Sequence, residues 1–388
     1  MPNPTLPILA ATLLSLALAA SAHATSFATL YHFTDKSDGG DPVGGVVQDS
    51  SGTLYGETYQ GGSYTCPNPP YNRQGCGTVY SLSKTGGFKL LASFTGASGA
   101  HGNVRLVLVG NTLFGATAAG GANSDGVIFS VKTNGTNFTI LHQFSGTDGM
   151  QPVALVAGTN GTLYGITEYG GADNYGVLFS TTQSGSYTVL YTFNLPANAY
   201  PDALIPGPNA TLLGSTHDGG SPMAGTEGCC GTIFDYSETT GKFTNLFTYP
   251  ATGADGGYPY VGSIGPGPTI YAGEFYAIDS LNAQSGLQVL APLNSFTYGS
   301  GVNSGPVYTP GGILYGVLLG SVEATDGVIY SLQNGVITDL FVFGGTCCGR
   351  TGSAPMAQPI LTRSGTLIGT TTASGDCNYC GTIWEYTP

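Results

Sequence analysis

Hydrophobic residues recur along this chain in a short run that begins with an aliphatic residue and ends, in most copies, with glycine. The first copy is Leu54-Tyr55-Gly56, and later copies stand at 113–115, 163–165, 212–214, 270–272, 314–316 and 367–369. Successive copies begin 59, 50, 49, 58, 44 and 53 residues apart. Strand-rich repeats of about 40 to 50 residues are typical of β-propellers. Seven copies therefore predict seven repeating units.

Each repeat contains four strand-length runs, which are clearest in the third copy. These runs are rich in β-branched and aromatic residues and lie at 152–156, 161–167, 176–180 and 187–193. Gly, Asn, Asp or Pro separates them, as expected for turns between strands. Outside the N-terminal segment, no stretch has the period of an amphipathic helix. The chain is predicted to be all-β, a seven-bladed β-propeller with four-stranded blades, although the strands within 260–300 stay unassigned.

The two ends of the chain predict how the ring closes. The last repeat stops after its third run, 381–386, and lacks a fourth. A spare run at 30–33 precedes the first complete repeat and matches the fourth runs at 91–94 and 141–144. We therefore expect the N-terminal strand to complete the last blade by pairing with 381–386, which would protect edges that would otherwise remain open.

Glycine occupies two regular positions in the repeat. The glycine that ends the Leu-Tyr-Gly run lies inside a predicted strand, where we expect the backbone of a neighbouring blade to approach closely. Glycine doublets follow the same strand at 61–62, 120–121, 170–171 and 219–220. These doublets are predicted to supply turn residues with positive φ.

The N-terminal segment has the features of a secretory signal peptide. A hydrophobic run at 8–20 is followed by Ala22-His23-Ala24, a small-x-small cleavage site. We interpret 1–24 as the signal peptide and 25–388 as the propeller, so the mature protein is expected to be secreted, either extracellular or periplasmic. No later segment is long and apolar enough to span a membrane.

All eight cysteines lie in the exported part, which favours disulfides over metal thiolates. Cys66 with Cys76 and Cys377 with Cys380 each fall within one predicted loop and are expected to pair. Two adjacent pairs form vicinal disulfides or cross-link loops that meet in space, and the sequence leaves this choice open. These pairs are Cys229 with Cys230 and Cys347 with Cys348. We expect no metal site and no cofactor.

The composition limits the partners of the protein. Charged residues make up 8% of the chain, and 9 basic against 22 acidic residues give a net charge of −13. Nucleic acids and anionic membranes are therefore excluded as expected partners, because both require a basic surface. The chain contains no Gly-x-Ser-x-Gly, His-Glu-x-x-His or P-loop motif, so the sequence supports no serine hydrolase, zincin or nucleotide-binding function.

The repeat resembles a known family. Read as Leu-Tyr-Gly-x-Thr-x-x-Gly-Gly, Gly-Thr-Val-Phe-Ser-Leu, Leu-His-x-Phe and Asp-Gly-x-x-Pro, it is similar to the GloVer tandem repeats of secreted bacterial proteins. The resemblance covers nearly all of 28–386 and is clearest at 161–201 and 365–386. It implies export and variable C-terminal anchoring, but no activity. The order of runs also resembles kelch propellers, although the paired Tyr and Trp of kelch repeats are missing.

Candidate ligand-binding residues lie in the connections between strands. If the proline-led run is innermost, as in kelch blades, the second-to-third and fourth-to-first connections emerge on one face of the disc, which we call the loop face. The candidates there are Asp38, Asp148, Glu168, Tyr169, His217, Asp218 and Asp255. The three aspartates precede glycine and also suit Asx turns, so both roles stay open for them. His32 and His142, matched to one strand position, indicate packing.

Two functions remain open. The preferred one is a monomeric, non-catalytic secreted protein that recognises a glycan, a peptide or a surface partner through the loop face, or serves as a scaffold. The alternative is a polysaccharide-active hydrolase or lyase, in which Glu57, Glu168 and Asp218 come together from different blades. Carboxylates that converge in one cleft would favour the enzyme, whereas a flat surface lined by Tyr and Asn would favour binding.

Overall fold

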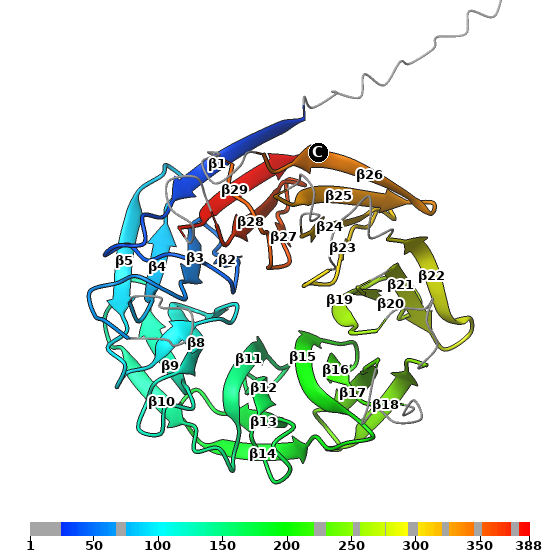
Figure 1. The fold of residues 1–388 in the computed structure, drawn as a ribbon, viewed down its shortest axis with the longest axis horizontal. Helices are drawn as coiled ribbons and strands as arrows, with labels where there is room; N and C mark the ends of the chain where they lie inside the picture. Colours follow the sequence, from blue (N-terminus) through cyan, green and yellow to red (C-terminus); the bar gives the residue numbers. More distant parts are fainter. Residues whose placement is uncertain are drawn as a thin grey trace, which may run out of the picture.

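The described chain forms a closed ring of seven antiparallel sheets around a central channel (Figure 1). The computed structural model describes residues 25–66, 75–220, 230–250, 257–275, 277–293, 302–319, 326–344, 351–373 and 380–388. Six sheets have four strands, and in the second sheet the innermost strand is divided in two. This arrangement confirms the predicted seven-bladed all-β propeller. The predicted signal peptide, 1–24, lies outside the described residues.

The first four blades follow the chain from the channel outward. The first comprises β2 (Val46–Gln48), β3 (Leu54–Glu57), β4 (Thr78–Leu82) and β5 (Phe88–Ser93). The second comprises β6 (Ala100–Gly102), β7 (Val107–Val109), β8 (Thr112–Ala119), β9 (Val127–Lys132) and β10 (Thr139–Gln143). The third comprises β11 (Met150–Ala157), β12 (Leu163–Tyr169), β13 (Val177–Thr181) and β14 (Tyr187–Thr192). The fourth comprises β15 (Ala199–Pro206), β16 (Thr211–Asp218), β17 (Thr232–Ser237) and β18 (Phe243–Thr248).

The remaining three blades complete the ring. The fifth comprises β19 (Tyr260–Ile264), β20 (Ile270–Gly273), β21 (Ala277–Asn282) and β22 (Gly286–Pro292). The sixth comprises β23 (Val307–Tyr308), β24 (Leu314–Leu318), β25 (Val328–Gln333) and β26 (Val336–Val342). The seventh comprises β27 (Ile360–Leu361), β28 (Leu367–Thr371), β29 (Thr382–Thr387) and the N-terminal strand β1 (Ser26–His32). In the described part of the chain, no helix is long and apolar enough to cross a membrane.

The N-terminal strand closes the ring as expected. β1 pairs antiparallel with β29, from Ser26 opposite Thr387 to His32 opposite Thr382. The ring of Phe27 also stacks on Phe341 of the sixth blade, with centroids 3.7 Å apart. Hydrogen bonds join β1 to the seventh blade while this aromatic contact reaches the sixth, so the strand secures the closure of the disc.

The glycine of the Leu-Tyr-Gly run is required for a reason different from the one predicted. In six blades it pairs across the sheet with a buried aromatic residue of the third strand. The pairs are Gly56–Tyr80, Gly115–Phe129, Gly165–Phe179, Gly214–Phe234, Gly316–Tyr330 and Gly369–Trp384. A Cβ at each glycine would overlap this ring. The close neighbour is therefore a side chain of the same blade, not the backbone of the next blade.

The fifth blade departs from the repeat in both members of this pair. Ala272 stands in place of the glycine, and it pairs with Asp279 in place of the aromatic residue. An aspartate is small enough to leave room for the alanine Cβ, whereas an aromatic ring would overlap it. The two departures compensate for each other, which explains how 260–300 still forms a blade although its sequence does not match the other repeats.

Left-handed residues join successive blades on the loop face. All eight glycines of the four doublets have positive φ, as predicted. A further set of residues with positive φ starts the innermost segments, and the set comprises Asp41, His101, Gln151, Tyr200, Tyr258 and Ala354. In Asp41, His101, Gln151, Tyr200 and Ala354 the N–H donates to a carbonyl just before the third strand of the preceding blade; Tyr200, for example, donates to Tyr175 at 3.0 Å. These bonds fix the backbone where it enters the channel.

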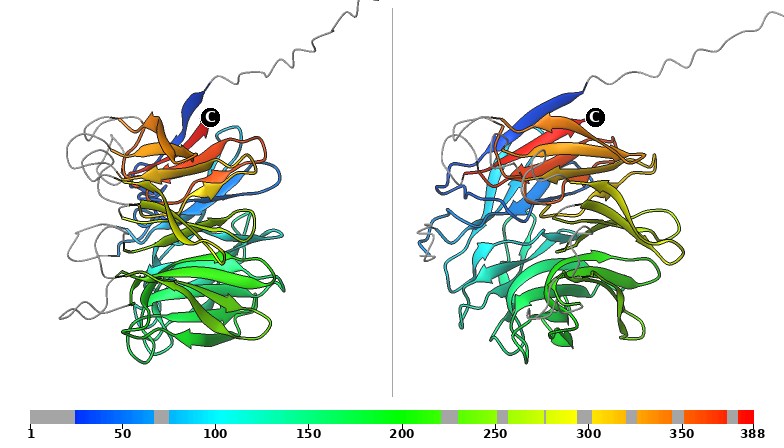
Figure 2. Two further views of the ribbon diagram at one scale, coloured as in Figure 1. Left: turned by 90° about the vertical axis from the view of Figure 1, so that its right-hand side faces the viewer. Right: turned by 45° about the vertical axis from the view of Figure 1, so that its right-hand side comes forward.

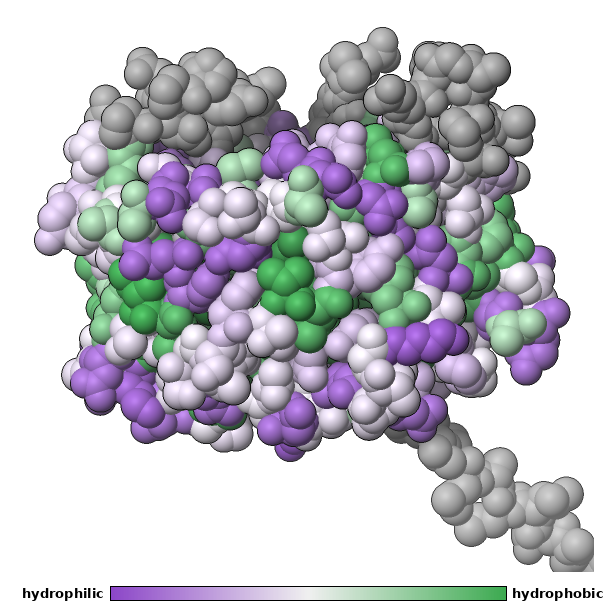
Figure 3. Space-filling view, turned by 90° about the horizontal axis from the view of Figure 1, so that it is seen from below, coloured by the Kyte–Doolittle hydropathy of each residue, from purple (hydrophilic) through white to green (hydrophobic). Residues whose placement is uncertain are grey.

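Seen from the side, the strands run across the thickness of the disc, and the connections emerge on two opposite faces (Figure 2). The outer rim carries hydrophobic patches separated by hydrophilic side chains (Figure 3). The rim is thus a mixed surface, and the connections leave the disc on either side of it.

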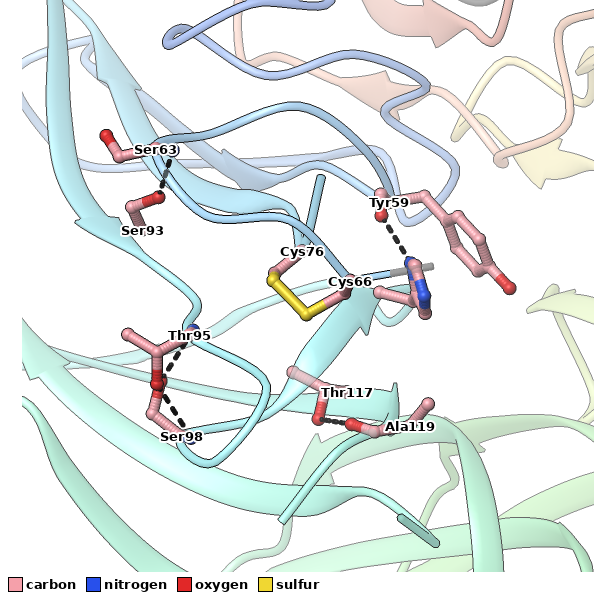
Figure 4. The surroundings of a disulfide bond; sticks show 10 residues. Tyr59, Ser63, Cys66, Cys76, Ser93, Thr95, Ser98, Thr117 and Ala119 are labelled. Atoms are coloured by element: carbon pink, nitrogen blue, oxygen red, sulfur yellow. Dashed lines mark hydrogen bonds between the residues drawn. A yellow bond between two sulfur atoms is a disulfide. The ribbon is translucent and has the colours of Figure 1, made fainter. Parts of the chain in front are cut away.

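The cysteine predictions are confirmed for one pair. Cys66 and Cys76 form the predicted disulfide in the β3–β4 connection, with Cα atoms 4.8 Å apart (Figure 4). Four other cysteines, Cys229, Cys347, Cys348 and Cys377, lie outside the described residues. The pairing of Cys377 with Cys380 and that of Cys347 with Cys348 therefore stay predictions.

Cys230 lies just before β17. The residue is half-buried, has a φ of 80°, and packs against the apolar core between the fourth and fifth blades. Because Cys229 lies outside the described residues, the vicinal Cys229–Cys230 bond is not confirmed. The packing of Cys230 gives it a structural role where the chain enters β17.

Candidate functional site

A cavity of about 490 Å³ opens at the mouth of the channel and continues into a channel region of about 590 Å³. Seven residues line both spaces, one from each blade, and we call them the channel ring. They are Val43, Asn103, Val153, Asp202, Tyr260, Asn303 and Met356. In five blades the ring residue directly follows a proline that begins the innermost segment. The fixed φ of proline and the left-handed residue before it set the direction of the chain at this point.

The channel ring has a polar side and an apolar side. Asp202, Tyr260 and Asn303 come from the fourth, fifth and sixth blades, which are neighbours, and form the polar side. The apolar side comprises Met356, Val43 and Val153 of the seventh, first and third blades, with the amide of Asn103 from the second blade between the two valines. A ligand in the cavity therefore meets hydrogen-bonding groups along one edge and hydrocarbon along another.

Two pairs of polar residues extend the wall of the cavity on the loop face. Glu168 and Tyr169 end β12, and His217 and Asp218 end β16. Both pairs stand between the threonine of the second strand and the glycine doublet, in consecutive blades. Because this repeat position projects toward the channel mouth, the structure brings together four of the seven residues that the sequence singled out.

His217 and Asp218 form a close pair. Nδ1 of His217 lies 2.8 Å from Oδ1 of Asp218, and the imidazole stacks on Tyr258 with centroids 3.9 Å apart. Burial alone would lower the pKa of His217, but the hydrogen bond and charge of Asp218, with smaller contributions from Asp202 and Glu168, raise it overall. Because Asp218 engages Nδ1, the other ring nitrogen, Nε2, is the one that a ligand can contact.

Asp202 is a carboxyl group with only one satisfied oxygen. Ser215 donates from Oγ to Oδ1 at 2.6 Å, whereas Oδ2 is shielded from water and has no hydrogen-bond partner among the described residues. Burial raises the pKa of Asp202 to about 7, although the hydrogen bond from Ser215 and the charge of His217 act in the opposite direction. Near neutral pH this side chain is therefore partly protonated and can donate a hydrogen bond, unlike an ordinary aspartate.

Three tyrosines face the same space. Tyr169 and Tyr200 meet edge to face with centroids 5.4 Å apart, and Tyr260 belongs to the channel ring. Burial and the adjacent Glu168 raise the pKa of Tyr169 to about 12, and burial with the charges of Asp202 and Glu168 raises that of Tyr260. The hydroxyl groups therefore stay protonated as donors, and the rings supply apolar faces for a ligand.

The remaining candidates do not reach the cavity. Asp38 accepts hydrogen bonds from Tyr31 Oη and the Thr34 backbone, and Asp148 accepts them from the Ser145 backbone and lies 3.0 Å from Nε2 of His142. Both aspartates thus order the turn between the outermost strand and the next blade, but they accept from N–H groups three or four residues earlier and not from one two residues ahead, as an Asx turn would require. Asp255 lies outside the described residues.

Glu57 is also absent from the site, contrary to its proposed place among converging carboxylates. It is fully buried, and its Oε1 accepts a hydrogen bond from the backbone N–H of Val104 in the next blade at 2.7 Å. This contact joins two blades and is structural.

The predicted match between His32 and His142 was wrong by one residue. Tyr31 is the equivalent of His142, because Tyr31 pairs with Ile383 just as His142 pairs with Ile128.

Sequence reasoning missed the channel ring, including Asp202 and Tyr260. The signal was present, because the residue after the proline changes from copy to copy between valine, aspartate, tyrosine and methionine while its neighbours repeat. A position that varies while its neighbours repeat is not fixed by the packing that all blades have in common. Among the described residues, no group of three or more His, Cys, Asp or Glu side chains is placed to hold a metal ion.

The raised pKa of Asp202 predicts a pH-dependent stability. The folded state keeps the proton up to about pH 7, whereas an unfolded aspartate loses it near its ordinary pKa of 3.8. Stability therefore falls as pH rises between about 4 and 7. Asp202→Asn should remove this decline and raise the unfolding free energy by about 2 kcal/mol above pH 7, with little effect near pH 4. Denaturant titrations of wild type and Asp202→Asn between about pH 4 and 7, with Asp148→Asn as control, measure this difference. If Asp202 does not keep its proton in the folded state, the unfolding free energies of the two proteins will change with pH in parallel.

Solved structures share this architecture at low sequence identity. A chain of the mitotic checkpoint complex matches with a TM-score of 0.57 and 12% identity, covering 99% of this chain and 100% of that one. Oligogalacturonate lyase in complex with manganese matches with a TM-score of 0.53 and 14% identity, covering 88% and 95%. The extracellular domain of the proposed one-component system BT4673 from B. thetaiotaomicron matches with a TM-score of 0.54 and 12% identity. This match spans 92% of this chain but only 39% of that one. These likenesses concern the fold alone.

Sequence comparison identifies the repeat itself. No curated protein matches the chain. The model of the Gloeobacter/Verrucomicrobia repeat matches residues 17–227 and 72–280, which together cover more than half of the sequence and include the first four blades. The match agrees with the Leu-Tyr-Gly repeat and with one blade per copy. The chain therefore belongs to the Gloeobacter/Verrucomicrobia repeat family.

Proposed function

We propose that this propeller is exported and binds a glycan in the cavity at the mouth of its channel. The observation that carries the proposal is the channel ring, with its polar side and its apolar side around one cavity. A sugar has the same division, because its hydroxyl groups lie around the edge of a ring whose faces carry C–H groups. Tyrosine rings next to carboxyl and amide groups can contact both parts at once.

The charge of the site narrows the class of glycan. Glu168, Asp202 and Asp218 line the cavity, and His217, the one basic side chain among the described residues of that lining, is already paired with Asp218. A carboxylate or sulfate on the ligand would meet repulsion from these groups. The proposal therefore excludes uronic acids and sulfated sugars as main ligands.

Export is supported by two features of the chain. The Cys66–Cys76 disulfide suits an oxidising compartment. The segment 1–24 has the pattern of a signal peptide, and family resemblance implies the same destination. Extracellular and periplasmic locations are both compatible with these features.

Binding should depend on the cavity and not on the loop face in general. Screening the mature protein on a glycan array should give neutral or amine-bearing ligands, and calorimetry should give a dissociation constant in the micromolar to millimolar range. Tyr260→Ala and Asp218→Asn should each weaken binding by about tenfold or more, because each removes a contact worth roughly 1.4 kcal/mol. Asp148→Asn, on the same face but outside the cavity, should bind as wild type. Equal affinity in all variants would refute the proposed site.

A second function, glycan hydrolysis, is favoured by one observation. Asp202 can carry a proton at neutral pH, while Glu168 and Asp218 border the same cavity. A neutral acid next to an ionised carboxylate is the arrangement used to protonate a leaving oxygen and activate water. A reducing-sugar assay on each ligand found by the array separates the two functions. Turnover that Asp202→Asn abolishes, with binding retained, would establish the enzyme.

A further inference from the structure

We infer that the cavity takes a saccharide unit that carries a positively charged amine, such as a free glucosamine residue. The inference rests on the proposed glycan binding and adds the class of sugar. It is carried by the distribution of charge around the cavity, by two shielded polar atoms that lack partners, and by the tyrosine rings.

The carboxyl groups surround one space. The charge of Glu168 acts on Tyr169 and Tyr260, that of Asp218 on Tyr169 and Tyr200, and that of Asp202 on Tyr260. His217 is acted on by all three acids. These shared effects mean that the three acids are close enough to act on a single bound group. An ammonium placed among them would be attracted by each of the three carboxyl groups. Among the described lining residues it would face one competing cation, His217.

The other cation of the channel does not compete. Arg105 lines the deeper region but not the mouth, and its guanidinium donates to the backbone carbonyl of Gln358. The side chain of Gln358 in turn donates to the carbonyls of Gly262 and Gly305 at 2.9 and 2.8 Å. Arg105 is thus committed to holding the innermost strands together, below the cavity.

Two wall residues carry oxygen atoms without partners. Oδ2 of Asp202 and Oδ1 of Asn103 are both shielded from water and accept no hydrogen bond from any described residue. A shielded acceptor without a donor costs roughly 1 to 3 kcal/mol, more if it is charged. An ammonium has three N–H donors and no acceptor, so it can satisfy either oxygen once the side chain rotates to expose that oxygen to the cavity.

The tyrosines favour a sugar as the carrier of this amine. Tyr169, Tyr200 and Tyr260 offer ring faces for sugar C–H groups and, near an ammonium, a cation–π attraction of about 0.5 to 2 kcal/mol. Val43 and Met356 on the opposite side leave an apolar surface for the rest of the ring. A bare polyamine would use the charges but not these surfaces.

Binding of a cation should release protons. Asp202 lines the same cavity as Glu168 and Tyr169 from β12, His217 and Asp218 from β16, and Tyr260 from β19, and Ser215 donates a hydrogen bond to it. A bound ammonium favours the ionised form of Asp202 and disfavours the charged form of His217, so both groups lose protons. Release should be largest near pH 7, where both groups still carry part of their protons.

The test compares two matched sugars by calorimetry on the mature protein. The probes are the β-1,4-linked tetramer of glucosamine and its fully N-acetylated counterpart, and a lysine-containing tetrapeptide serves as a third probe. We expect the free amine to bind at least about tenfold tighter at low salt, with the difference shrinking as salt rises. Glu168→Gln and Asp218→Asn should reduce this preference, whereas Asp148→Asn should keep it. Proton release, measured in buffers of different ionisation enthalpy, should fall in Asp202→Asn.

The outcomes separate this inference from the proposed function. Equal or tighter binding of the acetylated tetramer, lost in Tyr260→Ala, would overturn the amine preference and leave glycan binding in place. Binding of the peptide without binding of either tetramer would overturn the saccharide assignment. If the probes bind but Tyr260→Ala has no effect, both the inference and the proposed site fail.

Discussion

Deleting residues 25–34 should lower the free energy of unfolding by more than about 4 kcal/mol, or prevent folding altogether. The deletion removes β1, so β29 loses its hydrogen-bonding partner along six paired positions, from Thr382 to Thr387. It also removes Phe27 from its stack on Phe341 and from its contact with Trp384. The exposed edge of β29 should then pair between molecules. Thermal unfolding and light scattering of the two proteins measure both effects.

A point variant keeps this prediction testable if the deleted protein does not fold. Phe27→Ala preserves every backbone hydrogen bond of β1 but removes the stack, and should cost about 2 kcal/mol because the ring is half-buried. Ser26→Ala, on the exposed side of the same strand, should cost less than about 0.5 kcal/mol. Unchanged melting temperature in the deletion protein would show that β1 does not hold the ring closed.

Gly214→Ala should destabilise the protein by about 2 to 3 kcal/mol although it adds a single methyl group. The new Cβ would overlap Cζ of Phe234, and it would approach the carbonyl oxygen of Ala203 on the innermost strand. Neither can retreat, because Phe234 is fully buried and Ala203 lies in the neighbouring strand of the sheet. Denaturant unfolding gives the change directly.

A double-mutant cycle tests the cause of this loss. Phe234→Ala alone should cost about 3 to 4 kcal/mol through the cavity it leaves, and the double variant should cost clearly less than the sum of both. Gly311→Ala is the matched control, because its Cβ would have only one neighbour, Thr309 Oγ1 at 3.8 Å. Additive losses would mean that the ring of Phe234 is not what excludes a side chain at 214.

The sequence predicted the fold because the fold is periodic. Every blade needs the same strands and the same turns, so the constraint appears seven times and stands out from the variable residues. The spare strand at 30–33 gave the closure by simple counting. The purpose of Gly56 and its equivalents was misjudged, because the aromatic ring that occupies the space over each glycine lies 14 to 24 residues further along the chain, and the repeat alone does not show which residues face each other.

The site was predicted only in part, because its residues differ from copy to copy and do not repeat. Glu168 and His217 attracted notice because they break the repeat near the doublets, whereas Asp38 and Asp148 attracted notice because they recur before glycine, and these two order turns. Distinguishing the two groups requires knowing how far each lies from the channel. Asp202 could not be identified as unusual from its type, because its protonation arises from burial, which outweighs the opposing hydrogen bond from Ser215, and both depend on the packed blades.

The pairing of β1 with β29 also sets the order in which the molecule can assemble. Six blades consist of consecutive strands, and each can form soon after its own segment has been synthesised. β1 is the first of all the strands to be made, yet its partner is the last. Strand β1 therefore stays without its sheet partner until β29 has been synthesised. A chain interrupted before Thr382 would keep the first six blades but could never join its ends, so closure occurs only after synthesis is complete.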